Sequence, residues 1–160
     1  MNKKLVAYFS ASGSTAKLAK TLAAAAGAEI YEICPAVPYI RRDLNWMDKK
    51  SRSSVEMQDK DCRPELKDHD APVADADIIF LGFPIWWYRE PSIIDSFLDA
   101  YDFSGKTVVP FLTSGGSELG EGQERIEKLA GGAKVLRGKR FSSRASESEL
   151  KAWVSGQNLD

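Results

Sequence analysis

Short apolar runs alternate with segments of helical periodicity along this chain. Residues 3–9 form a largely apolar run of strand-forming side chains, and the alanine-rich segment 15–24 carries two leucines four residues apart, on one face of a helix. Gly27 is expected to end this helix. Residues 29–33 then alternate polar and apolar side chains, which is typical of a half-covered strand at a sheet edge. This order predicts the opening of a βαβ unit.

The alternation continues and predicts five parallel strands. Residues 76–82 and 106–113 are nearly continuous apolar runs, as expected for parallel strands buried on both faces, although the second contains a proline. A last strand begins at 133–136. Further helices are predicted at 92–101, 122–129 and 146–154. The chain of 160 residues has the usual size of one domain, so we expect a single α/β domain over residues 1–160.

The pattern weakens between residues 34 and 70. Prolines mark turns there, and acidic and basic side chains are evenly mixed, so most of the segment is expected to be a solvated connection. One helix is predicted over residues 43–58, capped by its first residue, with Leu44, Met47 and Val55 as a partial apolar face.

Composition and charge exclude several classes of protein. The 22 basic and 23 acidic residues give a net charge of −1, which argues against a general nucleic-acid binder. No apolar run approaches the roughly 18 to 20 residues of a membrane span, so we expect no membrane insertion. No signal-peptide pattern follows the N-terminus, so a cytoplasmic location is expected. Cys34 and Cys62 are predicted to be reduced thiols and His69 a solvated loop residue, which leaves no candidate metal site.

Three loops with unusual composition follow the predicted strands. In an open parallel sheet, ligands bind at the carboxyl ends of the strands. The first loop places four hydroxyl side chains and a glycine directly before a helix, whose unpaired N–H groups and dipole favour an anion. It consists of Ser10, Ala11, Ser12, Gly13, Ser14 and Thr15. It lacks the lysine of a nucleotide-triphosphate loop and the glycine pattern of a dinucleotide fold, so a monophosphate is the expected guest. The alternative is a capped helix without a ligand.

The second loop gathers aromatic residues between two prolines. It runs over residues 82–91 and contains Trp86, Trp87 and Tyr88. In an extended segment neighbouring side chains diverge, so the two tryptophans cannot both enter one core. The loop therefore predicts either a flat aromatic ligand or, alternatively, a satellite core or a protein contact.

The third loop, residues 113–120, is rich in glycine and small hydroxyl side chains, which let backbone approach a ligand closely. Alone it would be only a flexible turn.

Together these loops resemble the flavodoxin-like family. The Ser10-x-Ser12-Gly13-x-Thr15 loop is similar to that family's phosphate loop for flavin mononucleotide (FMN), residues 84–88 to its first ring-contacting loop and residues 113–116 to its second. The resemblance implies a doubly wound, five-stranded parallel sheet of order 2-1-3-4-5 with helices on both faces, and a bound FMN that carries the electrons. It implies no catalytic acid, base or nucleophile. The expected FMN-binding residues are Ser10, Ser12, Gly13, Ser14, Thr15, Pro84, Ile85, Trp86, Trp87, Tyr88, Thr113, Ser114, Gly115, Gly116 and Gly120.

The resemblance leaves the reaction and the partner open. Electron-carrying members of the family are strongly acidic, whereas this chain is nearly neutral, and its local acidity is confined to residues 75–102. We expect either a carrier with redox partner proteins or an FMN-dependent NAD(P)H:quinone oxidoreductase acting on a small electron acceptor. A third alternative is a module that has lost flavin, but the glycine and the aromatic residues are all present. The sequence does not specify an oligomeric state.

Overall fold

The core of the protein is a parallel sheet with helices on both faces. The computed structural model describes residues 3–114 and 118–159. The strands lie in the order β2-β1-β3-β4-β5, with β6 also paired to β4. They are β1 (Lys4–Tyr8), β2 (Glu29–Glu32), β3 (Ile78–Pro84), β4 (Thr107–Thr113), β5 (Lys134–Val135) and β6 (Lys139–Arg140). The predicted order is confirmed, with the fifth position divided into two short strands.

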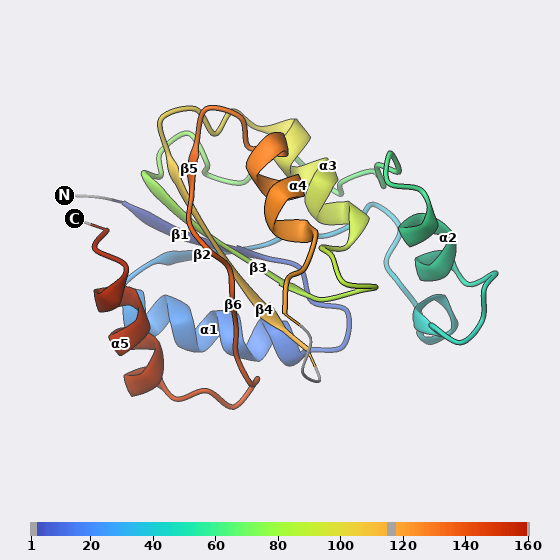
Figure 1. The fold of residues 1–160 in the computed structure, drawn as a ribbon, viewed down its shortest axis with the longest axis horizontal. Helices are drawn as coiled ribbons and strands as arrows, with labels where there is room; N and C mark the ends of the chain where they lie inside the picture. Colours follow the sequence, from blue (N-terminus) through green and yellow to red (C-terminus); the bar gives the residue numbers. More distant parts are fainter. Residues whose placement is uncertain (1–2, 115–117, 160) are drawn as a thin grey trace.

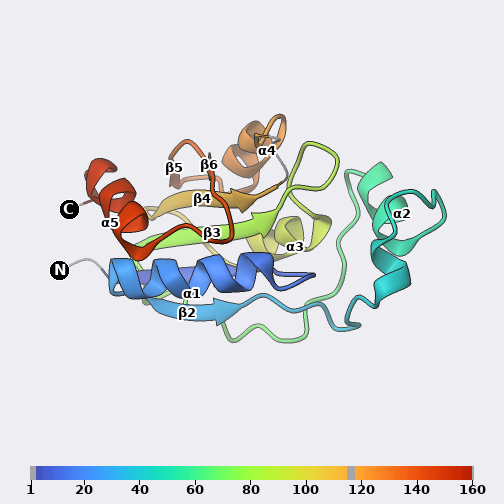
Figure 2. The same cartoon turned by 90° about the horizontal axis from the view of Figure 1, so that it is seen from below.

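Two pairs of helices cover the two faces of the sheet (Figures 1 and 2). Helices α1 and α5 cover one face, and α3 and α4 cover the other. Their bounds are α1 (Ser14–Ala26), α3 (Ser92–Ala100), α4 (Gly122–Leu129) and α5 (Glu147–Gly156). Each prediction for these helices is confirmed to within a few residues at its ends. Gly27 ends α1 with a φ of 65°, a conformation that glycine adopts without strain.

Each face of the sheet builds its own apolar core. Leu18 and Leu22 of α1 are fully buried against one face, and Ile93 and Phe97 of α3 against the other. Gly82, near the carboxyl end of β3, leaves room for the ring of Phe111, since a Cβ atom there would lie 2.2 Å from that ring. This close approach fixes β3 against β4 directly below two of the candidate loops.

The predicted helix over residues 43–58 is wrong. The structure has a short 3-10 helix, η1 (Arg41–Leu44), and, after a break, α2 (Arg52–Gln58). In the break, the side-chain oxygen of Asn45 accepts a hydrogen bond from the N–H of Met47. In the same way, the side-chain oxygen of Asp48 accepts from the N–H of Lys50. Such local bonds compete with helix formation.

The residues expected to begin and line that helix have other roles. Asp43 accepts from the N–H of Ile40 instead of capping a long helix, and Ser51 caps α2 through the N–H of Ser54. Met47 and Val55, expected on an apolar face, are 76% and 55% exposed.

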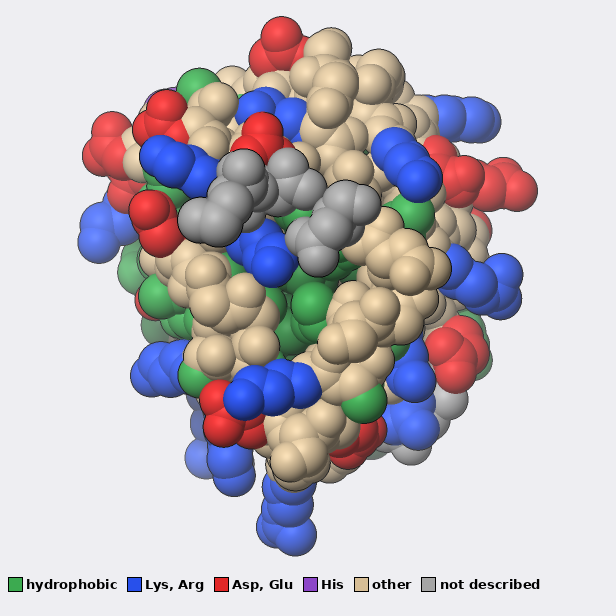
Figure 3. Space-filling model, turned by 90° about the vertical axis from the view of Figure 1, so that its left-hand side faces the viewer, with side chains coloured by type: hydrophobic (Ala, Val, Ile, Leu, Met, Phe, Trp, Pro, Cys, Tyr) green, Lys and Arg blue, Asp and Glu red, His purple; other side chains and the backbone are tan. Residues whose placement is uncertain are grey.

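The segment that carries η1 and α2 lies beyond the carboxyl ends of the strands, at the same end of the molecule as the three loops (Figures 1 and 2). The two termini lie at the opposite end. That opposite face carries charged side chains of both signs around its rim (Figure 3). Among the described residues, no helix combines the length and apolar character that crossing a bilayer requires.

Candidate functional site

The loop after β1 leaves the start of α1 without a side-chain cap. Gly13 occupies the N-cap position with a φ of 98°, a region that favours glycine, and it has no side chain to accept from the first turn. Ser10 accepts the Gly13 N–H through its Oγ at 3.1 Å, which closes the loop. The first-turn N–H groups of α1 are therefore left to an external acceptor, and an anion suits them.

Thr15 lies beneath this loop. Its side chain is 1% exposed, and its Oγ1 is 2.8 Å from the Oγ1 of Thr113 at the end of β4. This hydrogen bond joins the first candidate loop to the third. The structure thus brings these two predicted residues together, away from the open surface.

A cavity of about 360 Å³ opens beside the loop. Ser12 and Ser14 line it from one side, and Arg140, at the end of β6, lines it from the other. Among the residues that the structure describes, Arg140 forms no ion pair with a carboxylate. Hydroxyl groups, uncapped N–H groups and one guanidinium form a donor set that suits a phosphate.

The aromatic loop after β3 forms a tight hairpin turn. Trp86 N–H donates to the carbonyl of Arg89 at 3.1 Å, and Arg89 N–H donates back at 3.2 Å. The two residues between them, Trp87 and Tyr88, have φ values of 48° and 65°. Positive φ at both central residues is the conformation of a type I′ turn, which favours asparagine and glycine. Two large aromatic residues there are strained, and such strain is concentrated at functional sites.

This turn separates the two tryptophans. Trp86 is half-buried and packs edge-on against Phe9 and Tyr39, with ring centroids 5.7 and 5.6 Å apart. Trp87 is 42% exposed. The expectation that the two tryptophans do not both enter one core is confirmed, but its reason is corrected: the segment is a turn with positive φ, not an extended strand.

A second cavity, of about 330 Å³, lies against the turn. Ile85 and Ser114 form its base, and Trp86, Trp87 and Tyr88 form one wall. The opposite side comes from η1 and α2 and from the residues between them, and consists of Leu44, Trp46 and Ser53. Flat apolar walls with a few polar groups are typical of sites for planar ligands.

The two cavities adjoin each other. Ile85 and Ser114 line both of them. A ligand with a phosphate at one end and a planar ring at the other could therefore place its phosphate at the start of α1 and its ring beside Trp87.

The third predicted loop packs onto the second. Gly120 has a φ of 61°, and a Cβ atom there would lie 2.7 Å from the carbonyl oxygen of Tyr88. Only glycine allows this approach, so Gly120 supports the aromatic turn from behind. Pro84, at the end of β3, pairs with Thr113 and lines the phosphate-side cavity. Gly115 and Gly116 lie outside the described residues.

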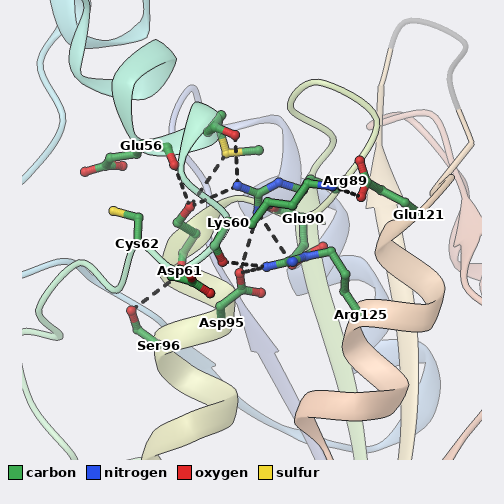
Figure 4. Close-up of polar contacts among 12 residues, drawn as sticks. Glu56, Lys60, Asp61, Cys62, Arg89, Glu90, Asp95, Ser96, Glu121 and Arg125 are labelled. Carbon is green, nitrogen blue, oxygen red and sulfur yellow. Dashed lines mark hydrogen bonds and ion pairs between the residues drawn. The ribbon is translucent and has the colours of Figure 1, made fainter.

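A buried cluster of charges holds the aromatic turn and α2 in place (Figure 4). Arg89 is 2% exposed, and its guanidinium donates to the carbonyl of Met57 at the end of α2. Glu90 and Asp95, both fully buried, accept from Arg125 of α4 at 3.0 and 2.6 Å. The cluster therefore connects the turn, α2, α3 and α4.

Burial of these carboxylates corrects one expectation from the sequence. Glu90 and Asp95 were counted with a local acidic surface, but both side chains lie inside the protein. Burial, and then the neighbouring carboxylate of Asp95, raise the pKa of Glu90 to about 8. One oxygen of each carboxylate has no hydrogen-bond partner among the described residues. These two acids therefore cannot steer a protein partner.

The predictions for the two cysteines and the histidine agree with the structure. Cys34 and Cys62 are free, and burial raises the pKa of both thiols. His69 is exposed. In the described part of the chain, His, Cys, Asp and Glu form no group that could hold a metal ion.

Sequence reasoning missed seven residues that line the two cavities: Leu44, Trp46, Ser53, Arg140, Phe141, Ser142 and Ser143. The first three lie in the segment assigned to solvated connection and a single helix. The signal that could have identified them is Trp46 itself, since a tryptophan in a charged connection is as unusual as the pair in the aromatic loop. Arg140 belongs to a strand of two residues, which is too short to predict from periodicity.

Comparison with known proteins identifies relatives of the chain as a whole. A protein-family model described as Flavodoxin matches residues 3–157. No curated protein matches the sequence.

Solved structures extend the match. The chain is similar to a candidate flavoprotein from Bacteroides eggerthii, with 42% identity, a TM-score of 0.93 and 100% of both chains covered. It is similar to another from Bacteroides uniformis, with 44% identity, a TM-score of 0.90 and 96% and 98% of the two chains covered. A flavoprotein from Lactobacillus acidophilus, solved in complex with FMN, shares the fold at 23% identity, with a TM-score of 0.70 and 96% and 99% covered. The chain belongs to the flavodoxin family.

Proposed function

We propose that this protein binds one FMN across the two adjoining cavities and carries electrons through it. The observation that supports this most strongly is that Ile85 and Ser114 line both cavities, so that a phosphate site and an aromatic ring site are continuous. The FMN in the related Lactobacillus acidophilus structure supports the same cofactor.

The phosphate end fits FMN in charge and shape. Ser12, Ser14 and Arg140 supply donors around a cavity at the start of α1, where the helix dipole also favours an anion. A hydrogen bond to a charged group contributes about 1.5 to 3 kcal/mol. These donors suit one terminal phosphate, and we therefore expect FMN rather than flavin adenine dinucleotide (FAD).

The ring end fits a planar heterocycle. Trp87 lines the cavity from the aromatic turn, and Trp46 lines it from the segment between η1 and α2. Stacking of a ring on such side chains contributes about 1 to 3 kcal/mol, by analogy with nucleobases on aromatic residues. FMN supplies the one- and two-electron chemistry when bound. The protein residues bind its phosphate, orient its ring and exclude water from one face.

A second candidate function is the reduction of a small acceptor such as a quinone with NAD(P)H. Two observations favour it. The net charge of −1 gives little steering towards basic protein partners. Trp46 and Met47, which are 71% and 76% exposed, line a further cavity together with Trp87, and a small aromatic acceptor could contact their apolar surface.

Titration of the apo-protein with FMN, FAD and riboflavin tests the binding proposal. We expect one FMN per chain, with riboflavin at least about 10-fold weaker because it lacks the phosphate contacts. Apo-protein that does not bind FMN would overturn the proposal, and equal affinities for FMN and riboflavin would place the phosphate elsewhere.

Paired turnover assays then separate the two functions. A carrier passes electrons from a flavodoxin reductase to cytochrome and does not oxidise NAD(P)H with a quinone. Rapid NAD(P)H oxidation that needs only the protein and a quinone would favour the reductase.

A further inference from the structure

Ser53 carries a buried hydroxyl with no partner. It lies in α2 and is 2% exposed, yet among the described residues its Oγ has no hydrogen-bond partner. Its neighbour Ser54 differs, because the Oγ of Ser54 accepts a hydrogen bond from Ser51 at 2.9 Å. A buried hydroxyl without a partner destabilises a folded protein, since its contact with water is not replaced.

The place of Ser53 suggests what this hydroxyl is for. It lines the cavity of about 330 Å³ beside the aromatic turn, here called the aromatic cavity, opposite Trp87 and Tyr88. The other side chains of that wall, Leu44 and Trp46, present carbon surface. A polar group in such a site fixes the orientation of a ligand more than it adds contact area.

The position of Ser53 is well defined. The end of its helix is held by Arg89, which donates to the carbonyl of Met57, and by Ser92, which donates to the carbonyl of Glu56. The same Arg89 closes the hairpin turn on the other side of the cavity. One residue therefore contacts both walls: the side chain of Arg89 binds α2 and its backbone closes the turn.

From these contacts we propose that the Ser53 hydroxyl forms a hydrogen bond with a ring heteroatom of the flavin, and that α2 is a specificity-determining wall of the ring site. The inference rests on the proposed FMN binding. The ring system of a flavin has carbonyl oxygens and ring nitrogens along one edge, and a serine hydroxyl can either donate to these or accept from a ring N–H.

The test compares Ser53→Ala with Ser54→Ala in the full chain, with lumiflavin as the probe because it contains only the ring system. For Ser53→Ala we expect the dissociation constant of lumiflavin to rise about 5- to 30-fold, and that of FMN by the same factor. The melting temperature of the apo-protein should rise by about 2 to 4 °C, because an unpartnered hydroxyl is removed. Ser54→Ala should lower the apo-protein melting temperature and leave the lumiflavin affinity within twofold.

Two results would overturn the inference. In the first, the wild type binds FMN but Ser53→Ala binds lumiflavin as the wild type does. In the second, Ser53→Ala lowers the apo-protein melting temperature, which would give the hydroxyl a structural role. Failure of the proposed function is recognised separately, since the wild-type protein itself would then not bind FMN.

Discussion

Gln123 makes the hydrogen bond that Pro110 cannot make. Leu136 N–H donates to the carbonyl of Val108, and in a parallel ladder the carbonyl of Leu136 would then accept from residue 110. Residue 110 is a proline without an N–H. The side-chain amide of Gln123 donates to Leu136 instead, at 3.1 Å, and accepts from Gly138 N–H at 2.9 Å. The side chain of Gln123 thus takes the place of a backbone hydrogen bond of the ladder, which explains why the fifth strand is divided into β5 and β6.

Gln123→Leu should therefore destabilise the protein although it adds apolar surface. The two backbone groups lose their partner, and we expect the free energy of unfolding to fall by about 1 to 3 kcal/mol in urea denaturation. Adding Pro110→Val, which restores an N–H, should recover part of the loss. The exposed Glu127→Gln on the same helix serves as the control. Additive effects of the two substitutions would argue against the link between these residues.

Arg140→Gln should weaken FMN about 10- to 100-fold while changing riboflavin little, because a charge-assisted bond to the phosphate is lost. Calorimetric titration of both ligands measures this difference. The adjacent Lys139→Gln makes the same charge change on the other side of the strand and should have little effect. If both substitutions weaken FMN equally, the guanidinium acts only through net charge.

The aromatic turn is expected to lower the stability of the apo-protein and to raise its affinity for FMN. Replacing Trp87 and Tyr88 together by Asn and Gly gives the sequence that a type I′ turn favours, so the apo-protein should gain about 1 to 3 kcal/mol. FMN affinity should fall by about 1 to 3 kcal/mol through the loss of stacking. Denaturation and titration of the same sample measure the two effects. An unchanged affinity would make the aromatic turn structural.

Trp86→Ala and Trp87→Ala should differ in their effects on apo-protein stability and on FMN affinity. Because Trp86 packs on Phe9 and Tyr39, its removal should lower the stability of the apo-protein by about 3 to 5 kcal/mol if the site does not collapse. Trp87→Ala should leave apo-protein stability nearly unchanged and weaken FMN. The opposite assignment would follow if Trp86→Ala changed binding and Trp87→Ala changed stability.

Glu90 should make the protein less stable as the pH rises. The pKa of its carboxyl is raised to about 8 by burial and by Asp95, so the unfolded chain releases this proton at lower pH than the folded protein. The free energy of unfolding should therefore fall between about pH 5 and pH 8, by at most about 1.4 kcal/mol per pH unit from this group.

Glu90→Gln should remove this part of the pH dependence, as measured by urea denaturation across the range. Glu124→Gln, an exposed change on α4, should keep the wild-type slope. A slope that is the same in Glu90→Gln and the wild type would mean that Glu90 is ionised alongside Arg89 and Arg125 throughout.

Periodicity in the sequence was enough to predict the parallel strands and four of the helices, whereas the order of the strands in the sheet came from the resemblance to the flavodoxin-like family. The buried strands are continuous apolar runs, and helices such as α5 start at a serine cap, Ser146, that can be read from local sequence. The segment 41–58 could not be predicted, because its break depends on side-chain bonds from Asn45 and Asp48 that compete with a helix that is equally possible locally.

The residues of the candidate site likewise fall into those that local sequence predicts and those that it does not. The loops that follow strands were found because their compositions are unusual. Ser53 and Arg140 reach the site only through tertiary packing: α2 is placed by the buried Arg89, and Arg140 by a two-residue strand. Neither relationship leaves a pattern in the local sequence. Likewise, the burial of Glu90 and Asp95 depends on Arg125, which is distant in the chain.

A crystal structure of the protein with bound FMN tests the central claim most directly. We predict that the phosphate lies at the start of α1, in contact with Ser12, Ser14 and Arg140, and that the ring lies in the aromatic cavity between Trp87 and Ser53. A phosphate bound away from α1, or a ring outside this cavity, would contradict the account.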